Sequence, residues 1–279
     1  MINKTKLNRN LLKMIIYISI IIILVIYLFP IIWEFSTSLK MIEEALSNYN
    51  LIPKKINFNN YIIAWTQFNV GRYLMNTVIV SVTICLGTIV SCSTAGYAFA
   101  QLRFPGKNFL FFLYLSTMMI PASITLIPSF FIIIKLNWNN TYLALIGPFI
   151  FGNAFGTFLL RQFYMTLPKD LSDSAKIDGA GFWKIWWNIM LPLSQPAMAT
   201  LAVMTIVSQW NSFLWPLVVT RTQEIKVLSV GLSDFRLMRN IQWTPLMAAV
   251  MLASIPMIVI LFVAQKYFIR GIQFSGVNR

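Results

Sequence analysis

The sequence predicts an all-α protein that crosses a membrane several times, and three observations support this prediction. Of the 279 residues, 58% are hydrophobic and only 11% are charged, whereas a soluble domain carries about a quarter charged residues. The mean hydropathy is +0.71. The long apolar runs lack the alternation of a transmembrane β-barrel, and only helices and closed barrels satisfy their backbone in lipid. A helical integral membrane protein is therefore expected.

Six apolar runs have about the length of a membrane span, which needs roughly 20 residues. They cover residues 13–33, 73–101, 108–134, 141–162, 197–220 and 244–268. The first run follows a basic segment, as in a signal peptide, but it is long for one and no small-x-small cleavage site follows it. We interpret it as an uncleaved first helix, and we expect residues 1–279 to form one transmembrane domain with six spans.

The distribution of Lys and Arg predicts the orientation. If the N-terminus lies inside, thirteen of the 22 Lys and Arg fall on the cytoplasmic side. The positive-inside rule then favours cytoplasmic N- and C-termini. This orientation places the polar segment 168–196 in a cytoplasmic loop between the fourth and fifth spans.

Several classes of function are excluded by what the sequence lacks. The net charge of +14 comes from short clusters beside the apolar runs, a pattern typical of lipid headgroup contact and not of nucleic-acid binding. The absence of His removes His-based catalysis and metal ligation. Cys85 and Cys92 are seven residues apart in one expected helix, roughly 10 Å along its axis, and cannot pair. No phosphate-binding loop occurs. We expect no catalytic residue, metal site or cofactor in this chain.

The carboxylates argue against an ion-coupled carrier. All eight Asp and Glu fall in loops or at span ends, whereas proton- or sodium-coupled carriers usually place an ionisable group inside the membrane. No internal repeat is visible either. If the protein moves a solute uphill, the energy must come from another subunit.

Five prolines lie in or beside the spans, which fits both ordinary membrane helices and the bent helices of a translocation path. They are residues 121, 128, 148, 216 and 256.

The loop 168–196 contains the stretch SDSAKIDGAGFWKIWWNIMLPLSQP, which begins at residue 172. We expect a short helix with Asp170 as its N-cap and Asp173 in the capping-box position. Gly179 would end that helix in the left-handed conformation. A second, Trp-rich helix is expected at 182–190, with its Trp residues at the membrane interface. Physical reasoning alone leaves a plain turn with Trp anchors as the alternative.

The same loop, with residues 191–196 reading LPLSQP, closely resembles the signature of binding-protein-dependent ABC importer permeases, which runs approximately E-A-A-x-x-D-G-A and then L-P-L-x-x-P. Further segments are similar to the carbohydrate branch of that family and to the shorter membrane subunit of the maltose system. They are FPGK (104–107), MMIP (118–121), LIP (126–128), FLLRQF (158–163), WNSFLWP (210–216) and the C-terminal run 265–279, where the family usually ends closer to G-A-V-K-G.

The resemblance implies a type I ABC importer permease fold in which the loop is a coupling helix that docks on a cytoplasmic ATPase. Asp173 stands in the position of the family's Glu, one methylene shorter, and Ser174 stands where the family has Ala. The implied docking residues are Asp173, Ser174, Ala175, Asp178, Gly179 and Ala180. Small residues permit close docking, and the acid fixes register through a charge-assisted contact. The tail Gly276, Val277, Asn278 and Arg279 would reach the ATPase dimer interface, unless it is simply a disordered basic end.

The implied assembly contains a homologous second permease, two copies of an ATPase that bind ATP and Mg, and an extracellular or periplasmic sugar-binding protein. The chain would be a non-catalytic, multi-pass protein of a bacterial cytoplasmic membrane. Amide and aromatic side chains that could line a sugar path are Gln209, Trp210, Asn211 and Trp215. Such residues also serve helix packing, and in some relatives only the partner permease contacts the sugar. A permease for glycerol phosphate or peptide, and a channel or secondary carrier, are the alternatives.

Overall fold

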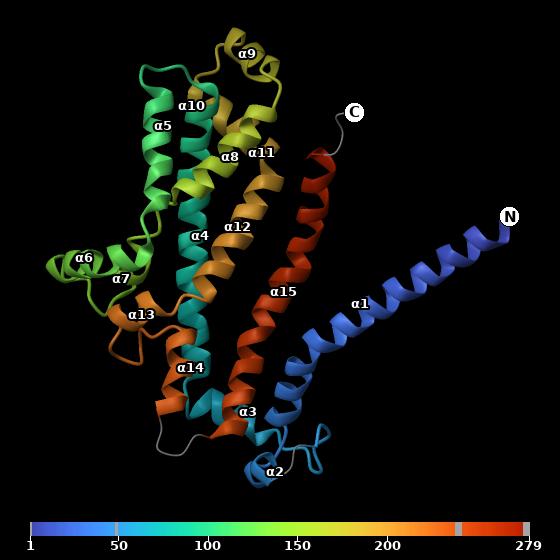
Figure 1. Cartoon of the computed structure of the whole chain (residues 1–279). Helices are drawn as coiled ribbons and strands as arrows, with labels where there is room; N and C mark the ends of the chain where they lie inside the picture. Colours follow the sequence, from blue (N-terminus) through green and yellow to red (C-terminus); the bar gives the residue numbers. More distant parts are fainter. Residues whose placement is uncertain (1, 48–49, 238–241, 276–279) are drawn as a thin grey trace. The chain divides into compact units, whose positions relative to one another are not determined.

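The computed structural model describes residues 2–47, 50–237 and 242–275, and all regular structure in these ranges is helical (Figure 1). The chain divides into two compact units, Met1–Val70 with Asp234–Ser254, and Gly71–Ser233 with Ile255–Arg279. Two helices, α14 (Leu228–Leu237) and α15 (Trp243–Ser275), contribute residues to both units. The expectation of an all-helical membrane protein is confirmed.

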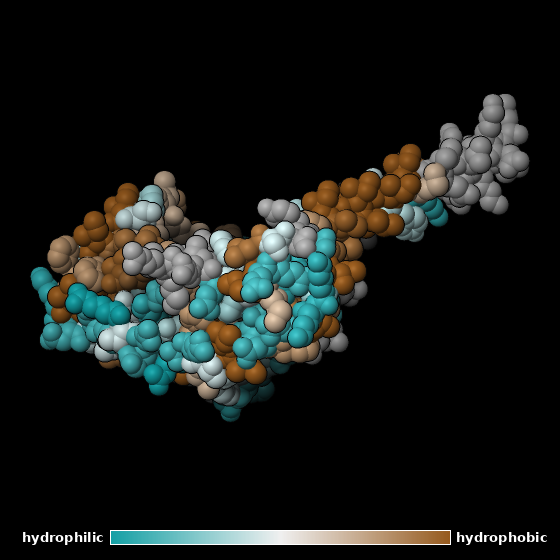
Figure 2. Space-filling model, turned by 90° about the horizontal axis from the view of Figure 1, so that it is seen from below, coloured by the Kyte–Doolittle hydropathy of each residue, from teal (hydrophilic) through white to brown (hydrophobic). Residues whose placement is uncertain are grey.

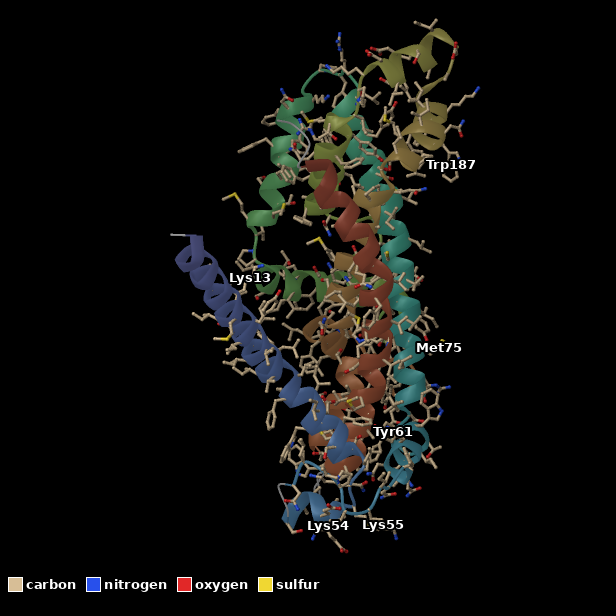
Figure 3. The ribbon with its side chains drawn as sticks, turned by 90° about the vertical axis from the view of Figure 1, so that its right-hand side faces the viewer. Lys13, Lys54, Lys55, Tyr61, Met75 and Trp187 are labelled. Carbon is tan, nitrogen blue, oxygen red and sulfur yellow. The ribbon has the colours of Figure 1, made fainter. Side chains whose placement is uncertain are left out.

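The first unit contains α1 (Ile2–Ser38), α2 (Ile42–Ser47) and α3 (Asn59–Thr66). The stretch Leu12–Ser38 of α1 is long and apolar enough to cross a membrane, and none of its most apolar window is buried within the protein. These side chains form the arm of hydrophobic surface in Figure 2. Lys13 near one end of α1, and Lys54 and Lys55 in the loop beyond its other end, flank this apolar stretch (Figure 3). That arrangement is typical of a membrane span with charged ends.

The C-terminal end of α1 is held in place by a buried polar cluster within the first unit. The Asn60 side-chain amide donates to the carbonyls of Ser38 and Lys40, 2.8 Å each. The Ser38 hydroxyl lies 2.7 Å from the Tyr61 hydroxyl. The Lys40 ammonium donates to the Asn50 carbonyl and lies 5.0 Å from the centre of the Trp33 ring. These contacts satisfy the carbonyls that the end of a helix leaves free.

The second unit is built around α4 (Val70–Gln101). The elements that follow are α5 (Lys107–Ser116), a 3₁₀ turn (Thr117–Met119), α6 (Ala122–Lys135), α7 (Tyr142–Ile146), α8 (Ala154–Thr166), α9 (Asp170–Ile177), α10 (Phe182–Ile185), a π turn (Trp186–Met190), α11 (Leu191–Leu193), α12 (Gln195–Trp210) and α13 (Leu214–Val219). Two apolar cores lie along α4. One contains Ile84 and Trp215, and the other contains Cys92, Tyr164 and Leu201.

The spans are less continuous than the hydropathy predicted. Three described helices are long and apolar enough to cross a membrane, at Leu12–Ser38, Val70–Gln101 and Trp243–Gln265. Two bent pairs would raise the number to five. They are Lys107–Met119 with Ala122–Lys135, bent by 97°, and Phe182–Leu193 with Gln195–Trp210, bent by 77°.

Local backbone chemistry explains the breaks. Pro121 precedes α6 and the residue before it, Ile120, is extended, because proline disfavours a helical residue before it. The expected span 141–162 consists of α7 and α8 with an irregular segment between them, where Gly152 has φ +77°. In contrast, Pro128 and Pro256 lie inside α6 and α15 without ending either helix.

Candidate functional site

The helix α9 begins at Asp170, so the residue in its N-cap position is Lys169 and not Asp170. Lys169 is in the helical conformation and makes no side-chain cap, while its carbonyl accepts from the amides of Ser172 and Asp173, 3.0 Å each. The expectation that Asp170 is the N-cap is therefore wrong, because Asp170 is already the first helical residue. Its carboxylate lies in the first turn, where negative charge favours the helix dipole.

The end of α9 confirms the glycine elbow. Gly179 has φ +76°, its amide donates to the Lys176 carbonyl at 3.0 Å, and the Ala180 amide donates to the Ala175 carbonyl at 2.9 Å. This pair of bonds is the Schellman motif, which uses a left-handed residue to stop a helix. A Cβ atom added to Gly179 would meet nothing within 4 Å. The glycine is thus required by backbone conformation, and the surface around it is open.

Asp173 does not form the expected capping box. Its carboxylate accepts a hydrogen bond and ion pair from Lys176 at 2.7 Å, and both side chains are at least half exposed. The hydrogen bond and the positive charge of Lys176 lower the pKa of Asp173 below its ordinary value. Exposed pairs of this kind contribute little to stability. Lys176 can therefore be exchanged at small cost for a cation on another protein.

The second helix of the loop is present, but its three Trp residues differ. Trp183 is 72% exposed and Trp187 is 62% exposed, whereas Trp186 is only 6% exposed. Trp186 packs in the core with Tyr164 and Met190, and its ring lies 5.9 Å from that of Trp183. Trp186 attaches the loop to the body of the second unit. The other two indoles are exposed and can contact the membrane interface.

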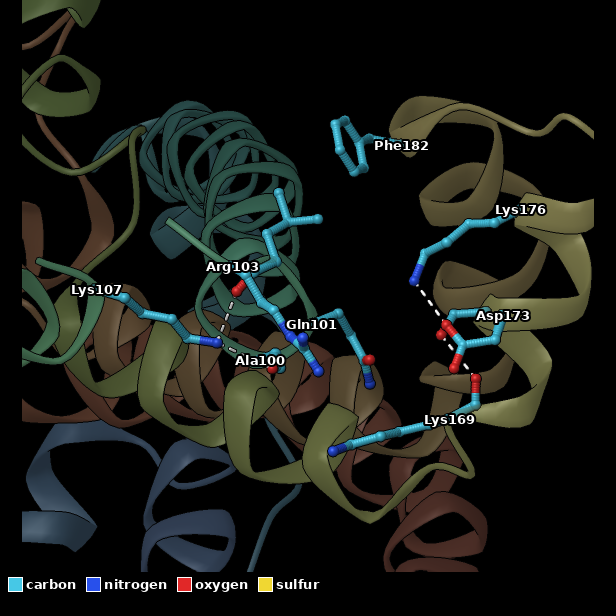
Figure 4. A pocket seen from close by; sticks show the side chains of 10 residues that line it. Ala100, Gln101, Arg103, Lys107, Lys169, Asp173, Lys176 and Phe182 are labelled. Atoms are coloured by element: carbon cyan, nitrogen blue, oxygen red, sulfur yellow. Dashed lines mark hydrogen bonds and ion pairs between the residues drawn. The ribbon is translucent and has the colours of Figure 1, made fainter. Parts of the chain in front are cut away.

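A basic hollow of about 560 Å³ lies beside α9 (Figure 4). The sequence reasoning missed it, because its walls come from the α4–α5 turn and from α9. Lys107 holds that turn by donating to the carbonyls of Ala100 and Leu102, at 3.2 and 2.9 Å. The charged residues that line the hollow are Arg103, Lys107, Lys169, Asp173 and Lys176. Four cations and one carboxylate create a surface that suits an anionic group. The only signal in the sequence was the FPGK segment.

Of the suggested sugar-path residues, Gln209 and Trp215 line one small cavity of about 10 Å³, whereas Trp210 and Asn211 are not part of its lining. Trp210 and Trp215 are each 8% exposed, and the Trp215 indole donates to the Ala144 carbonyl at 3.0 Å. The Asn211 side chain donates to the Val207 carbonyl at the end of α12. Gln209 lines a second hollow of about 210 Å³ between α4, α8 and α12. Gly276 to Arg279 lie outside the described residues.

Comparisons with known proteins identify the family of the chain. The family described as "Binding-protein-dependent transport system inner membrane component" matches residues 87–274. The chain belongs to this family. The motifs predicted a permease of a binding-protein-dependent ABC importer, and this prediction is confirmed. The chain is a membrane permease component of that importer type.

Curated relatives cover most of the chain. The arabinooligosaccharides transport system permease protein AraQ of Halalkalibacterium halodurans is 35% identical over 227 residues, covering 81% of each chain. AraQ of Bacillus subtilis is 33% identical over 257 residues, 91% of each chain. The sn-glycerol-3-phosphate transport system permease protein UgpE of Yersinia pestis is 33% identical over 276 residues, 95% of this chain and 97% of UgpE.

A solved structure supports the fold. A chain of a bacterial ABC transporter involved in the import of the acidic polysaccharide alginate superposes with a TM-score of 0.85 at 24% identity. The match covers 93% of this chain and 97% of that chain. The chain therefore shares its overall helical fold with that transporter chain.

Proposed function

We propose that this chain is a permease subunit of a carbohydrate ABC importer and forms half of its translocation path together with a homologous second permease. The observation that carries the proposal is the exposed loop α9–Gly179–α10, in which a left-handed glycine joins two short helices on an open surface. The names of the AraQ relatives and the alginate transporter favour an oligosaccharide as the solute.

In this assembly the chain performs no covalent chemistry. Two copies of a cytoplasmic ATPase bind ATP and Mg, and an external binding protein delivers the sugar. The chain lies in a bacterial cytoplasmic membrane with six spans and both termini inside. The apolar surface of α1, which the first unit leaves uncovered, supports a position against lipid or the second permease.

The loop would couple ATP hydrolysis to transport as a lever. Asp173, Ser174, Ala175, Asp178, Gly179 and Ala180 form the docking surface for the ATPase. Docking exchanges Lys176 for a basic group of the ATPase as the partner of Asp173. Trp186 ties the loop to the core, so movement of the docked loop is passed to α12 and changes which side of the membrane is open.

The glycine elbow gives a direct test. We expect Gly179→Trp to leave membrane insertion intact and to separate ATP hydrolysis by the reconstituted complex from sugar uptake, because an L-residue is strained at φ +76° and the indole would occupy the docking surface. The measurements are ATPase rate and uptake in proteoliposomes. Uptake at the wild-type rate would overturn the docking role.

Gly181→Ala is the matched control. Gly181 lies in the same loop, has an ordinary φ of −74°, and would meet nothing within 4 Å of an added Cβ atom. Uptake by this variant is expected to stay within about twofold of wild type.

A second solute class is favoured by the similarity to UgpE, whose name specifies sn-glycerol 3-phosphate. Stimulation of the reconstituted ATPase by loaded binding protein, measured over a panel of neutral sugars and phosphate esters, decides between them. A channel or secondary carrier would instead be isolated without an ATPase and would work without ATP.

A further inference from the structure

The hollow that includes Gln209 borders the middle of α4. Ile84 and Thr88 line one side and belong to the middle of α4, which is long and apolar enough to span the membrane. Ile84 is part of one apolar core of the second unit, and Leu201 on the opposite wall is part of the other. The hollow is therefore bordered by residues of both cores.

Two threonines of low exposure line this hollow. Thr88 is 1% exposed and Thr205 is 8% exposed, and both side chains line the hollow. Thr200, on the same helix as Thr205, instead donates to the Pro196 carbonyl at 3.0 Å. The hydroxyl groups of Thr88 and Thr205 can each donate and accept a hydrogen bond, so they offer polar contacts to an occupant of the hollow.

Amide groups complete the polar lining. Asn153 uses its side-chain oxygen to cap α8, accepting from the Gly156 amide at 2.7 Å, which leaves its NH₂ group available. Ser208 and Gln209 lie on adjacent positions of α12 and make no side-chain hydrogen bond to the described residues. These donors and acceptors come from three separate segments and converge on one space.

The backbone beside the hollow is irregular. Phe149, Gly152 and Asn153 line it and lie between α7 and α8, outside any helix. Non-helical backbone at membrane depth is tolerated where it is buried in protein or lines a water-filled cavity. Solute sites of membrane transporters are commonly formed by such interrupted helices.

We propose that this hollow is a subsite for one ring of a neutral sugar during its passage through the membrane, an inference that rests on the proposed function. Its volume of about 210 Å³ holds roughly seven water molecules at about 30 Å³ each, comparable to a single sugar ring. Phe149 and Phe155 supply apolar faces beside the polar groups.

The charge of the lining selects the class of solute. Every lining residue of this hollow is uncharged. A phosphate ester or a uronate would leave its negative charge without a partner, which is costly in a low-dielectric site. Neutral hydroxyl groups, in contrast, match the threonine, serine and amide groups. The subsite therefore takes neutral oligosaccharides and rejects acidic ones.

The test uses the complete importer in proteoliposomes, with uptake of labelled arabino- and malto-oligosaccharides compared with sn-glycerol 3-phosphate and an oligouronate. We expect Thr205→Val to lower kcat/KM for the neutral sugar about fivefold and Gln209→Leu about tenfold, the loss of one hydrogen bond or slightly more. Thr200→Val on the same helix is the control and should match wild type, since its hydroxyl bonds the helix backbone. The amount of each variant in the membrane is measured by immunoblot.

The outcomes separate this inference from the proposed function. If ATP-dependent sugar uptake persists and both variants equal Thr200→Val, the hollow is not a subsite but the importer function stands. If an acidic solute is transported in preference, the assignment of a neutral ligand is overturned. If no solute is taken up in an ATP-dependent way, the proposed function fails and this inference fails with it.

Discussion

The two hollows of the second unit differ in charge and in depth. The hollow beside α9 carries four cations and one carboxylate, and its charged side chains can reach water. The hollow between α4, α8 and α12 is lined by uncharged residues only. A charged side chain is stable where water solvates it, whereas placing it inside a membrane costs free energy. The hollow beside α9 thus offers charged groups to a ligand, whereas the hollow between α4, α8 and α12 offers uncharged hydrogen-bonding groups.

We call the hollow between α4, α8 and α12 the inner hollow and the one beside α9 the outer hollow. The largest effect on uptake is expected when one unit of charge is placed in the inner hollow. Gln209→Lys introduces an ammonium without a partner, a penalty of several kcal/mol, which corresponds to a loss of uptake of roughly a thousandfold. The reverse exchange in the outer hollow, Lys169→Gln, is expected to change uptake by no more than about threefold, since surface charges contribute little. Uptake in proteoliposomes measures both. Similar losses for the two variants would show that the distinction between the hollows is wrong.

Two glycines extend the comparison to the backbone. Gly152 at the inner hollow and Gly106 beside the outer hollow have nearly the same φ, +77° and +75°. A Cβ atom at Gly152 would come within 2.5 Å of the buried Cys92 sulfur, whereas at Gly106 it would meet nothing within 4 Å. Both Ala variants carry the left-handed strain of about 1–2 kcal/mol. Gly152→Ala adds an overpacking cost of about 1–3 kcal/mol.

Thermal unfolding of the purified complex in detergent measures this difference. We expect Gly106→Ala to lower the unfolding temperature slightly and Gly152→Ala to lower it clearly more. Equal shifts would mean that the segment around Gly152 accommodates a methyl group as easily as the exposed turn at Gly106.

The outer region could be predicted from sequence to a much greater extent than the inner one. The elbow at Gly179 depends on neighbouring residues, so Asp-Gly after a short polar helix was sufficient to predict it. The capping role of Asp170 was wrong because the backbone of Lys169, which the sequence does not reveal, starts the helix one residue earlier.

The inner hollow depends on distant residues. Thr88, Asn153 and Thr205 belong to three separate segments, and a threonine in an apolar helix is usually a packing residue. The break between α7 and α8 had local signals in Pro148 and Gly152, but the hydropathy of 141–162 concealed them. Gln209 lines this hollow and Trp210 and Trp215 are each 8% exposed, a difference that residue type alone does not predict. The place of these residues in a sugar path stays a prediction.

The smallest effect on stability is expected at Asp173, where charge is exposed. Because the pKa of Asp173 is lowered in the folded protein, its contribution is present above the pKa of the unfolded carboxyl, about 3.9, and is lost as the pH falls below it. Asp173→Asn should therefore change the unfolding temperature by less than about 1 °C at pH 7, and the small difference from wild type should vanish near pH 3.

The same substitution should have a larger effect on transport, because the proposed partner of Asp173 in the assembled importer is a cation of the ATPase. We expect sugar-stimulated ATP hydrolysis to fall about tenfold in Asp173→Asn, the loss of a charge-assisted hydrogen bond. Asp173→Glu keeps the charge and restores the length that the related permeases usually have, so it should retain most of the activity. If Asp173→Asn changes sugar-stimulated ATP hydrolysis as little as it changes the unfolding temperature, Asp173 interacts only within α9 and does not contact the ATPase. The basic hollow beside α9 would then be the remaining charged surface able to bind a partner.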